Sequence, residues 1–295
     1  MHDVRLTCSM HYIQAKSLLS SKNGINIYRG CTHGCIYCDS RSLCYQMPHD
    51  FSDVAVKENA VELLDDALSR KRRKGMIGFG SMSDPYIPAE RELQLTRRCL
   101  EVISRRSFGV SLITKSDLVL RDIDLLQEIN RKRKAVVSVT LTTADDALCK
   151  IIEPHVCATS RRAEVLAELQ DAGIPTVVWL CPILPYINDT VENLEGILNI
   201  CRETGVSRIL CFGFGMTLRE GCREYYYQKL DEYFPGLSSR YVREFGQTYS
   251  VQSPNAEKLE AVFSAFCKRE GVERDITKIF SYLSEMESDK QATLF

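Results

Sequence analysis

The chain has 295 residues, of which 44% are hydrophobic and 26% are charged, and its 38 basic residues nearly balance its 39 acidic ones. This composition can fill a sizeable core, and the charge balance excludes a strong overall attraction to polyanions. Neither a signal peptide nor an apolar run of about 18 residues is present, which predicts a cytoplasmic protein without a membrane span. The thirteen cysteines are irregularly spaced, so we expect free thiols rather than a disulfide framework.

Apolar runs alternate with amphipathic patterns through about the first 220 residues. Strands are predicted over residues 25–30, 76–81, 109–115, 135–141, 174–182 and 207–213, and helices over 56–71, 90–106, 120–132 and 160–172, with a further helix capped by Asp189. Such apolar strands joined by helices predict a parallel sheet covered by helices. Six units are two fewer than a closed eight-stranded barrel has. The expected fold class is therefore α/β, an open partial (β/α)6 barrel with its chemistry at the carboxyl ends of the strands.

The strand pattern stops after residue 220, and two helical patterns close the chain. We divide the chain into an N-terminal segment (1–24), the barrel core (25–220), a C-terminal helical extension (221–288) and a mobile tail (289–295). The tyrosine-rich start of the extension is expected to pack on the barrel, although stacking on nucleic-acid bases is an alternative.

Three closely spaced cysteines follow the first predicted strand. Cys31, Cys35 and Cys38 have a three-then-two spacing, with Tyr37 directly before the last. Thiolates bind iron–sulfur clusters, and a four-iron cluster normally has four such ligands. Three thiolates would leave one iron free to bind another molecule. The alternatives are buried cysteines or a zinc site completed by His33, Cys44 or His49, although zinc sites favour a second ligand pair that is missing here.

The pattern C-x-x-x-C-x-aromatic-C resembles the cluster loop of radical S-adenosylmethionine (SAM) enzymes. This resemblance implies a [4Fe-4S] cluster on Cys31, Cys35 and Cys38, SAM bound at the open iron, and Tyr37 near the adenine. It also implies reductive cleavage of SAM to a 5′-deoxyadenosyl radical, with an electron donor such as flavodoxin or ferredoxin. Residues 80–103, 112–126 and 181–190 resemble the subfamily named after spore photoproduct lyase, and the likeness extends over about residues 20–270.

The resemblance implies further SAM contacts at the ends of strands. Ser83 and Asp84 follow the second strand and would hold the amino group, although they also fit an ordinary Ser-Asp-Pro turn. Gly80 would let the backbone approach the ligand closely. Lys115 would bind the carboxylate. Arg162 would make an ionic contact with cofactor or substrate, with a solvated helix face as the alternative.

Two hydroxyl side chains alternate with valines on the fourth predicted strand. Ser138 and Thr140 therefore share one face of that strand. Burial of two hydroxyls against apolar helices would be costly, so we expect this face to line the barrel interior. There the hydroxyls could bind the ribose or the carboxylate of SAM.

The chain departs from the lyase at one catalytic position. The lyase has a hydrogen-donating cysteine two residues before the Ser-Asp pair, where this chain has Ser81. A serine O–H bond is too strong for that role. Cys181 and Tyr45 are the substitute donors we consider, although Cys181 also fits a buried apolar role. The substrate is therefore open, with a damaged or modified nucleic-acid base suggested by the subfamily.

The last five residues have a pattern of their own. Gln291, Leu294 and Phe295 resemble the Gln-x-x-Leu-Phe peptide with which bacterial repair and replication proteins bind the sliding clamp. A mobile tail with two apolar anchors suits binding in a groove. The tail could instead pack on the domain. If it binds a clamp, it links the protein to DNA. A second hypothesis is therefore a non-enzymatic DNA-repair accessory protein whose cluster is structural or redox-sensing.

Overall fold

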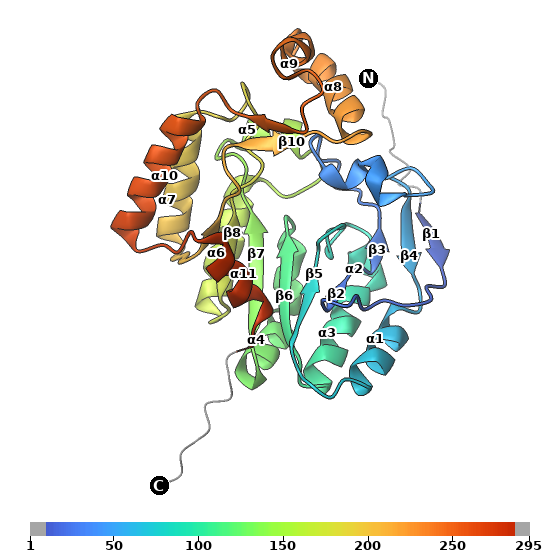
Figure 1. Ribbon diagram of the computed structural model, residues 1–295. Helices are drawn as coiled ribbons and strands as arrows, with labels where there is room; N and C mark the ends of the chain where they lie inside the picture. Colours follow the sequence, from blue (N-terminus) through green and yellow to red (C-terminus); the bar gives the residue numbers. More distant parts are fainter. Residues whose placement is uncertain (1–9, 287–295) are drawn as a thin grey trace.

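The computed structural model describes residues 10–286 (Figure 1). Its main sheet has six strands in the order β2-β5-β6-β7-β8-β9, and each pair of neighbours is parallel. The strands are β2 (Gly24–Ile25), β5 (Met76–Phe79), β6 (Gly109–Thr114), β7 (Ala135–Thr140), β8 (Thr176–Trp179) and β9 (Ile209–Leu210). Within the described residues, β2 and β9 are edge strands that do not pair with each other. The prediction of an open, six-stranded parallel barrel is confirmed.

Helices between the strands cover one face of the sheet. They are α1 (Ala60–Ser69), α2 (Glu90–Leu93), α3 (Leu95–Arg105), α4 (Ile123–Lys132), α5 (Asp146–Ile152), α6 (Thr159–Asp171) and α7 (Val191–Glu203). The α3 helix illustrates why they form: Leu95, Cys99, Leu100 and Ile103 recur at helical spacing and are all buried in the main core. None of the described helices is long and apolar enough to cross a membrane.

The first predicted strand divides in two, which the sequence pattern did not reveal. After β2 the chain forms β3 (Tyr28–Arg29), which leaves the main sheet and pairs antiparallel with β4 (Val54–Lys57). The parallel partner of β4 on its other side is β1 (Met10–Ile13). The predicted helix over 56–71 was therefore wrong at its start, because buried side chains of β4 precede the first turn of α1.

The cap of α7 also differs from the prediction. Thr190 is the N-cap, and its side chain accepts a hydrogen bond from the backbone N–H of Asn193 at 3.1 Å. Asp189 instead accepts hydrogen bonds from the Tyr186 N–H at 2.8 Å and the Ser253 hydroxyl at 2.5 Å. Asp189 therefore joins the loop after β8 to the C-terminal extension, which only the tertiary structure could bring near it.

The extension contains α8 (Cys222–Tyr233), α9 (Leu237–Phe245), α10 (Ala256–Glu270) and α11 (Ile276–Ser284). It also contains the short strand β11 (Ser250–Gln252), which pairs antiparallel with β10 (Gly215–Thr217), so strands do not end at residue 220 as expected. Tyr226 and Tyr241 are fully buried in a core beside the barrel mouth. These two tyrosines therefore pack the extension onto the barrel and are not exposed for stacking on bases.

The last helix, α11, lies across the sheet face that the other helices leave open (Figure 1). Its Ile279 and Leu283 form a small core with Val136 of β7, Val177 of β8 and Leu210 of β9. The neighbouring residues of these strands point to the opposite face and join the main core. The extension therefore fills part of the barrel interior, and the space that stays open lies toward the carboxyl ends of the strands.

Candidate active site

The cysteine loop (residues 30–38) follows β3 and is fixed by backbone hydrogen bonds at both ends. The Cys31 N–H donates to the Phe51 carbonyl, and the Ile36 N–H donates to the Ile152 carbonyl, each at 3.0 Å. Gly30 has φ of +100°, and a Cβ there would lie 2.6 Å from the Phe51 carbonyl oxygen. The loop therefore needs glycine at this position to pack against residue 51.

The three thiols of this loop are buried or half-buried and influence one another electrostatically. Burial raises the pKa of the Cys35 thiol, an effect that nearby Lys115 opposes, and burial followed by Cys31 raises the pKa of Cys38. In the described part of the chain, these three sulfur atoms do not form a compact site for a single metal ion. That separation argues against the zinc alternative and suits a larger cluster.

His33 favours the ligating form of Cys31. Burial alone would raise the pKa of the Cys31 thiol, but the adjacent His33 outweighs it and the pKa is lowered. Burial would lower the pKa of His33, but Cys31 and Asp84 together raise it to about 9. The His33 Nδ1 atom lies 3.4 Å from an Asp84 carboxylate oxygen. A thiolate at Cys31 is thus stabilised before any metal binds.

Asp84 and Ser83 hold the walls of the site together. The Asp84 carboxylate accepts hydrogen bonds at 2.8 Å from the Thr114 hydroxyl and from the N–H groups of Lys115 and Tyr86. The Ser83 hydroxyl donates to the Gly30 carbonyl at 2.6 Å. Both side chains therefore connect β5 and β6 to the cysteine loop from behind the cavity wall. Their predicted contact with SAM stays a prediction.

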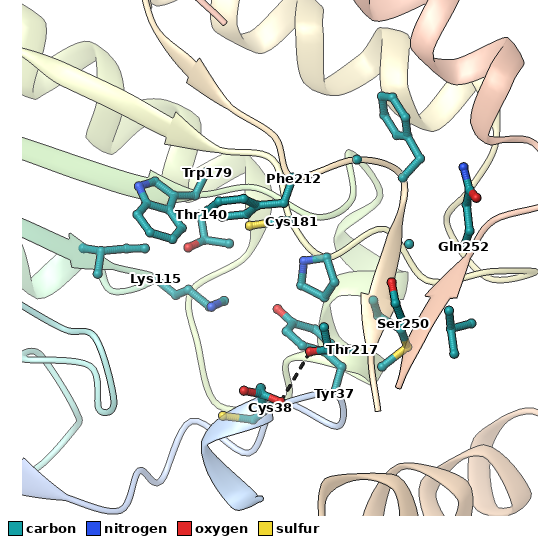
Figure 2. Close-up of a pocket in the computed structure, with 18 residues that line it drawn as sticks. Tyr37, Cys38, Lys115, Thr140, Trp179, Cys181, Phe212, Thr217, Ser250 and Gln252 are labelled. Atoms are coloured by element: carbon teal, nitrogen blue, oxygen red, sulfur yellow. Dashed lines mark hydrogen bonds between the residues drawn. The ribbon is translucent and has the colours of Figure 1, made fainter. Parts of the chain in front are cut away.

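A cavity of about 490 Å³ lies beside the cysteine loop, at the carboxyl ends of β6, β7 and β8. Figure 2 shows Tyr37 and Cys38 on one side of this cavity, with Lys115 pointing into it and Thr140 and Cys181 across it. Five of the predicted site residues therefore meet at one cavity. Others predicted with them lie outside its lining: Gly80, Ser83, Asp84, Ser138 and Arg162.

Lys115 is a half-buried cation whose side chain lines this cavity. Burial would lower the pKa of its ammonium group, but the Cys35 thiol and the Glu153 carboxylate act more strongly and raise it. The Lys115 Nζ atom lies 5.8 Å from the centre of the Tyr37 ring. Lys115 therefore stays charged beside the cysteine loop, where it can bind an anionic group such as a carboxylate.

Arg162 is 1% exposed, in contrast to the solvated helix face considered from sequence. Its guanidinium donates to the Thr140 carbonyl at 2.8 Å and forms an ion pair with Glu153. Glu153 also accepts a hydrogen bond from the Tyr37 hydroxyl. Arg162 thus helps to position Tyr37 indirectly, because it holds the Glu153 carboxylate to which the Tyr37 hydroxyl donates. Sequence analysis missed Glu153 because the short helix α5, which it follows, was not predicted.

The other predicted positions differ in access to the cavity. Cys181 lines it, and burial raises the pKa of its thiol to about 12. Tyr45 lies outside the lining, where its hydroxyl donates to Asp39 and accepts from Arg219, both at 3.0 Å.

Two further predicted residues also lie outside the lining of the cavity. Ser138 is buried inside the barrel, two residues before Thr140 on β7. Gly80, with φ of +90°, packs against the Ile113 carbonyl of β6.

An aromatic wall, which sequence analysis did not predict, borders the cavity. Trp179 and Phe212 line it, and Phe280 of α11 packs against both, with ring centres 5.9–6.2 Å apart. Phe212 is 55% exposed. The Trp179 Nε1–H is buried, and no acceptor lies near it in residues 10–286. The three rings come from distant parts of the chain, so no local pattern connects them.

The tail residues Gln291, Leu294 and Phe295 lie outside the described part of the chain. Their resemblance to a clamp-binding peptide therefore stays a prediction.

An open parallel α/β barrel with a three-cysteine loop at the carboxyl ends of its strands defines a class of enzymes that perform radical chemistry. The sequence model of the radical SAM superfamily matches residues 25–206, and the chain belongs to this superfamily. The family implies a [4Fe-4S] cluster and SAM, and the buried, charge-assisted cysteine loop beside a cavity fits both. The comparisons give no support to a non-enzymatic accessory role.

Three known proteins illustrate these similarities. An uncharacterized protein of Methanocaldococcus jannaschii is 37% identical over 186 residues, which span 62% of this chain and 68% of that protein. The radical SAM Nalpha-GlyT isomerase of Pseudomonas phage M6 is 24% identical over 56% of this chain and 34% of its own. Spore photoproduct lyase, solved with a dinucleoside spore photoproduct, is similar in fold, with a TM-score of 0.63 and 13% identity over 88% of this chain and 79% of its own.

Proposed function

We propose that this protein binds a [4Fe-4S] cluster through Cys31, Cys35 and Cys38 and cleaves SAM reductively. When bound together, cluster and SAM supply a 5′-deoxyadenosyl radical, which abstracts hydrogen from a substrate in the cavity. The observation that carries the proposal is the convergence of the three-cysteine loop, the charged Lys115 and the cavity at the carboxyl end of the sheet.

The residues around the cavity have distinct tasks in this proposal. Lys115 binds the carboxylate of SAM, because a half-buried ammonium group that points into the cavity can form a charge-assisted hydrogen bond with an anion there. Tyr37 packs near the adenine in an orientation fixed by its hydrogen bond to Glu153. Thr140 offers a hydroxyl to the ribose. Ser83 and Asp84 keep their predicted role at the amino group, which the resemblance to the superfamily implies.

The proposed substrate is a nucleic-acid base. The exposed ring of Phe212 and the neighbouring Trp179 supply an aromatic surface on the cavity wall, on which a planar base could stack. Spore photoproduct lyase, which has a similar fold, was solved with a dinucleoside photoproduct. Cys181 supplies the hydrogen atom that returns to the substrate radical, since its raised pKa keeps it in the S–H form.

Two partners belong to the same proposal. A small reductant such as flavodoxin or ferredoxin delivers the electron to the cluster. The tail ending in Gln291, Leu294 and Phe295 binds a sliding clamp and brings the enzyme to DNA. A peptide of residues 287–295 should bind purified bacterial clamp, and the same peptide with Leu294 and Phe295 replaced by alanine should not.

The first experiment is an anaerobic assay with reconstituted protein, SAM and dithionite, in which 5′-deoxyadenosine is quantified. Wild type should form it and Cys35→Ala should not. Cys44→Ala is the matched control, because Cys44 is an exposed cysteine six residues beyond the three-cysteine pattern, and it should retain wild-type activity. An intact, reducible cluster whose EPR spectrum ignores SAM would refute the proposal and favour the accessory-protein hypothesis.

A further inference from the structure

A second cluster of metal-binding side chains lies away from the cavity. His11 of β1 and His49 and Asp53 of the segment before β4 bring three ligand atoms within 4.8 Å of one another. The His11 Nδ1 atom lies 3.0 Å from an Asp53 carboxylate oxygen. Two ligands of one ion, each about 2.0–2.1 Å from it, are separated by about 3.0–3.4 Å. The His11–Asp53 pair therefore already has the spacing of metal ligands, and the ligand atom of His49 lies within 4.8 Å of both.

The hydrogen bonding of His49 prepares it as a ligand. Its Nδ1 atom lies 3.0 Å from the Asp50 carbonyl oxygen, which can only accept, so Nδ1 carries the proton. The Nε2 atom then has a free lone pair. It is buried, and within residues 10–286 no group hydrogen-bonds to it. Metal-binding histidines commonly have this arrangement, with one ring nitrogen held by a carbonyl and the other directed at the ion.

The local backbone brings these residues together. The Asp53 N–H donates to the Asp50 carbonyl at 3.1 Å and closes a turn that returns residue 53 toward residue 49. The strand β1 lies beside β4 (Figure 1), with His11 paired in register with Ala55. His11 thus comes from the N-terminal strand, and the site would tie two segments separated by 37 or more residues of sequence.

We propose that His11, His49 and Asp53 bind one divalent transition-metal ion, with Zn²⁺ as the best match. Two imidazoles and one carboxylate form a three-ligand set that suits zinc, and the partial exposure of His11 and Asp53 lets water complete the coordination. The site is separate from the cysteine loop and goes beyond the proposed radical chemistry.

The position of the site gives the ion a structural task. Between its ligands His49 and Asp53 lies Phe51, whose carbonyl accepts the N–H of Cys31. The same carbonyl packs against Gly30 at the start of the cysteine loop. An ion that fixes both ends of this short segment therefore fixes the backbone that supports the first cysteine, and it slows loss of the cluster.

The test uses the full-length, cluster-loaded protein, freed of loose metal and titrated anaerobically with ZnCl₂. Wild type should retain one more equivalent of zinc than His49→Gln or His11→Gln, and His155→Gln, an exposed histidine outside the site, should match wild type. Zinc should lengthen the half-life of the cluster in wild type several-fold and leave the His49→Gln half-life unchanged. Equal zinc contents in wild type and His49→Gln would overturn the site, and an unchanged half-life in wild type would overturn its structural task.

The chain has many cysteines that could also bind zinc, so the ligands of the retained zinc need to be identified directly. A spectroscopic measurement on wild type alone does this, and it does not depend on how the variants fold. Zinc X-ray absorption should show a shell of nitrogen and oxygen at about 2.0–2.1 Å with an imidazole pattern. A sulfur shell at about 2.3 Å would assign the zinc to cysteines and overturn the proposal.

Discussion

The carboxylate of Glu153 accepts a hydrogen bond from the hydroxyl of Tyr37, and the two residues are 116 positions apart in the chain. Glu153 is fully buried and forms an ion pair with Arg162, which is also buried. Burial alone would raise the pKa of Glu153, but Arg162 and Lys115 lower it, so the carboxylate stays ionised. The pair thus anchors the aromatic residue of the cysteine loop to a charge inside the protein.

Neutralising Glu153 should destabilise the fold. In Glu153→Gln the buried Arg162 loses its counter-charge, and removal of one partner of a buried ion pair typically costs about 3–5 kcal/mol. Anaerobic urea denaturation of the cluster-loaded protein should show this loss. Glu164→Gln removes an exposed carboxylate from α6 and should leave the midpoint near that of wild type. A Glu153→Gln protein as stable as wild type would show that the ion pair contributes little.

Lys115 should control SAM affinity more than protein stability. If it binds the SAM carboxylate, Lys115→Met removes one partner of a buried charge pair, which costs about 2–5 kcal/mol, or roughly a 30-fold or greater loss of affinity. Isothermal titration of SAM into the cluster-loaded protein measures the effect. Lys150→Met, an exposed lysine of α5, is the control and should bind SAM normally. Equal SAM affinity in the two variants would remove Lys115 from the SAM site.

Cys181 should resist alkylation at moderately alkaline pH. Burial raises the pKa of its thiol from an ordinary value near 9 to about 12. The stability that comes from this raised pKa is therefore fully present below pH 9 and is lost as the pH rises from about 9 to about 12. At pH 8.5 Cys181 is in the unreactive S–H form. Brief iodoacetamide treatment at pH 8.5, followed by peptide mass spectrometry, should modify the exposed Cys44 well before Cys181. Rapid labelling of Cys181 would contradict a protected S–H donor.

Replacing Cys181 should separate SAM cleavage from completed turnover. If Cys181 is the hydrogen donor, Cys181→Ala should still form 5′-deoxyadenosine but should release less product or form side products. The measurement is the ratio of product to 5′-deoxyadenosine in single-turnover reactions, with Cys201→Ala, a buried cysteine of α7, as the control. A wild-type ratio in Cys181→Ala would exclude it as the hydrogen donor.

Trp179 is the single tryptophan of the chain and lies on the cavity wall. Its fluorescence in cluster-free protein should therefore change when a nucleoside stacks in the cavity, which gives a direct screen for substrates. Trp179→Ala should weaken such binding by about 1–3 kcal/mol, the typical value of one base–aromatic stack, as measured by equilibrium dialysis. Tyr233→Ala, an exposed aromatic residue of α8, should bind like wild type. No response to any nucleoside would argue against a base as substrate.

Local sequence patterns were sufficient for the architecture and for the superfamily. The strands β5 to β8 can be predicted from their apolar runs, because a strand that is buried on both faces must be apolar along its length. The spacing of Cys31, Cys35 and Cys38 indicates the superfamily because all three cysteines lie within eight residues. Lys115 and Thr140 both line the cavity, and their places at the ends of predicted strands explain why, since residues at the carboxyl ends of parallel strands meet at one edge of a sheet.

The sequence by itself thus determined the open parallel barrel, the superfamily and the loop that would bind the cluster, because each depends on the order of nearby residues. Tertiary structure alone decided that Arg162 is buried with Glu153, that Asp189 joins the extension instead of capping α7, and that α11 enters the barrel interior. Contacts of this kind form between residues that are far apart in the sequence and become neighbours only in the folded chain. The residue type at one position does not indicate which distant residue it will contact. For that reason the aromatic wall beside the cavity and the His11–Asp53 pair emerged only when the chain was folded.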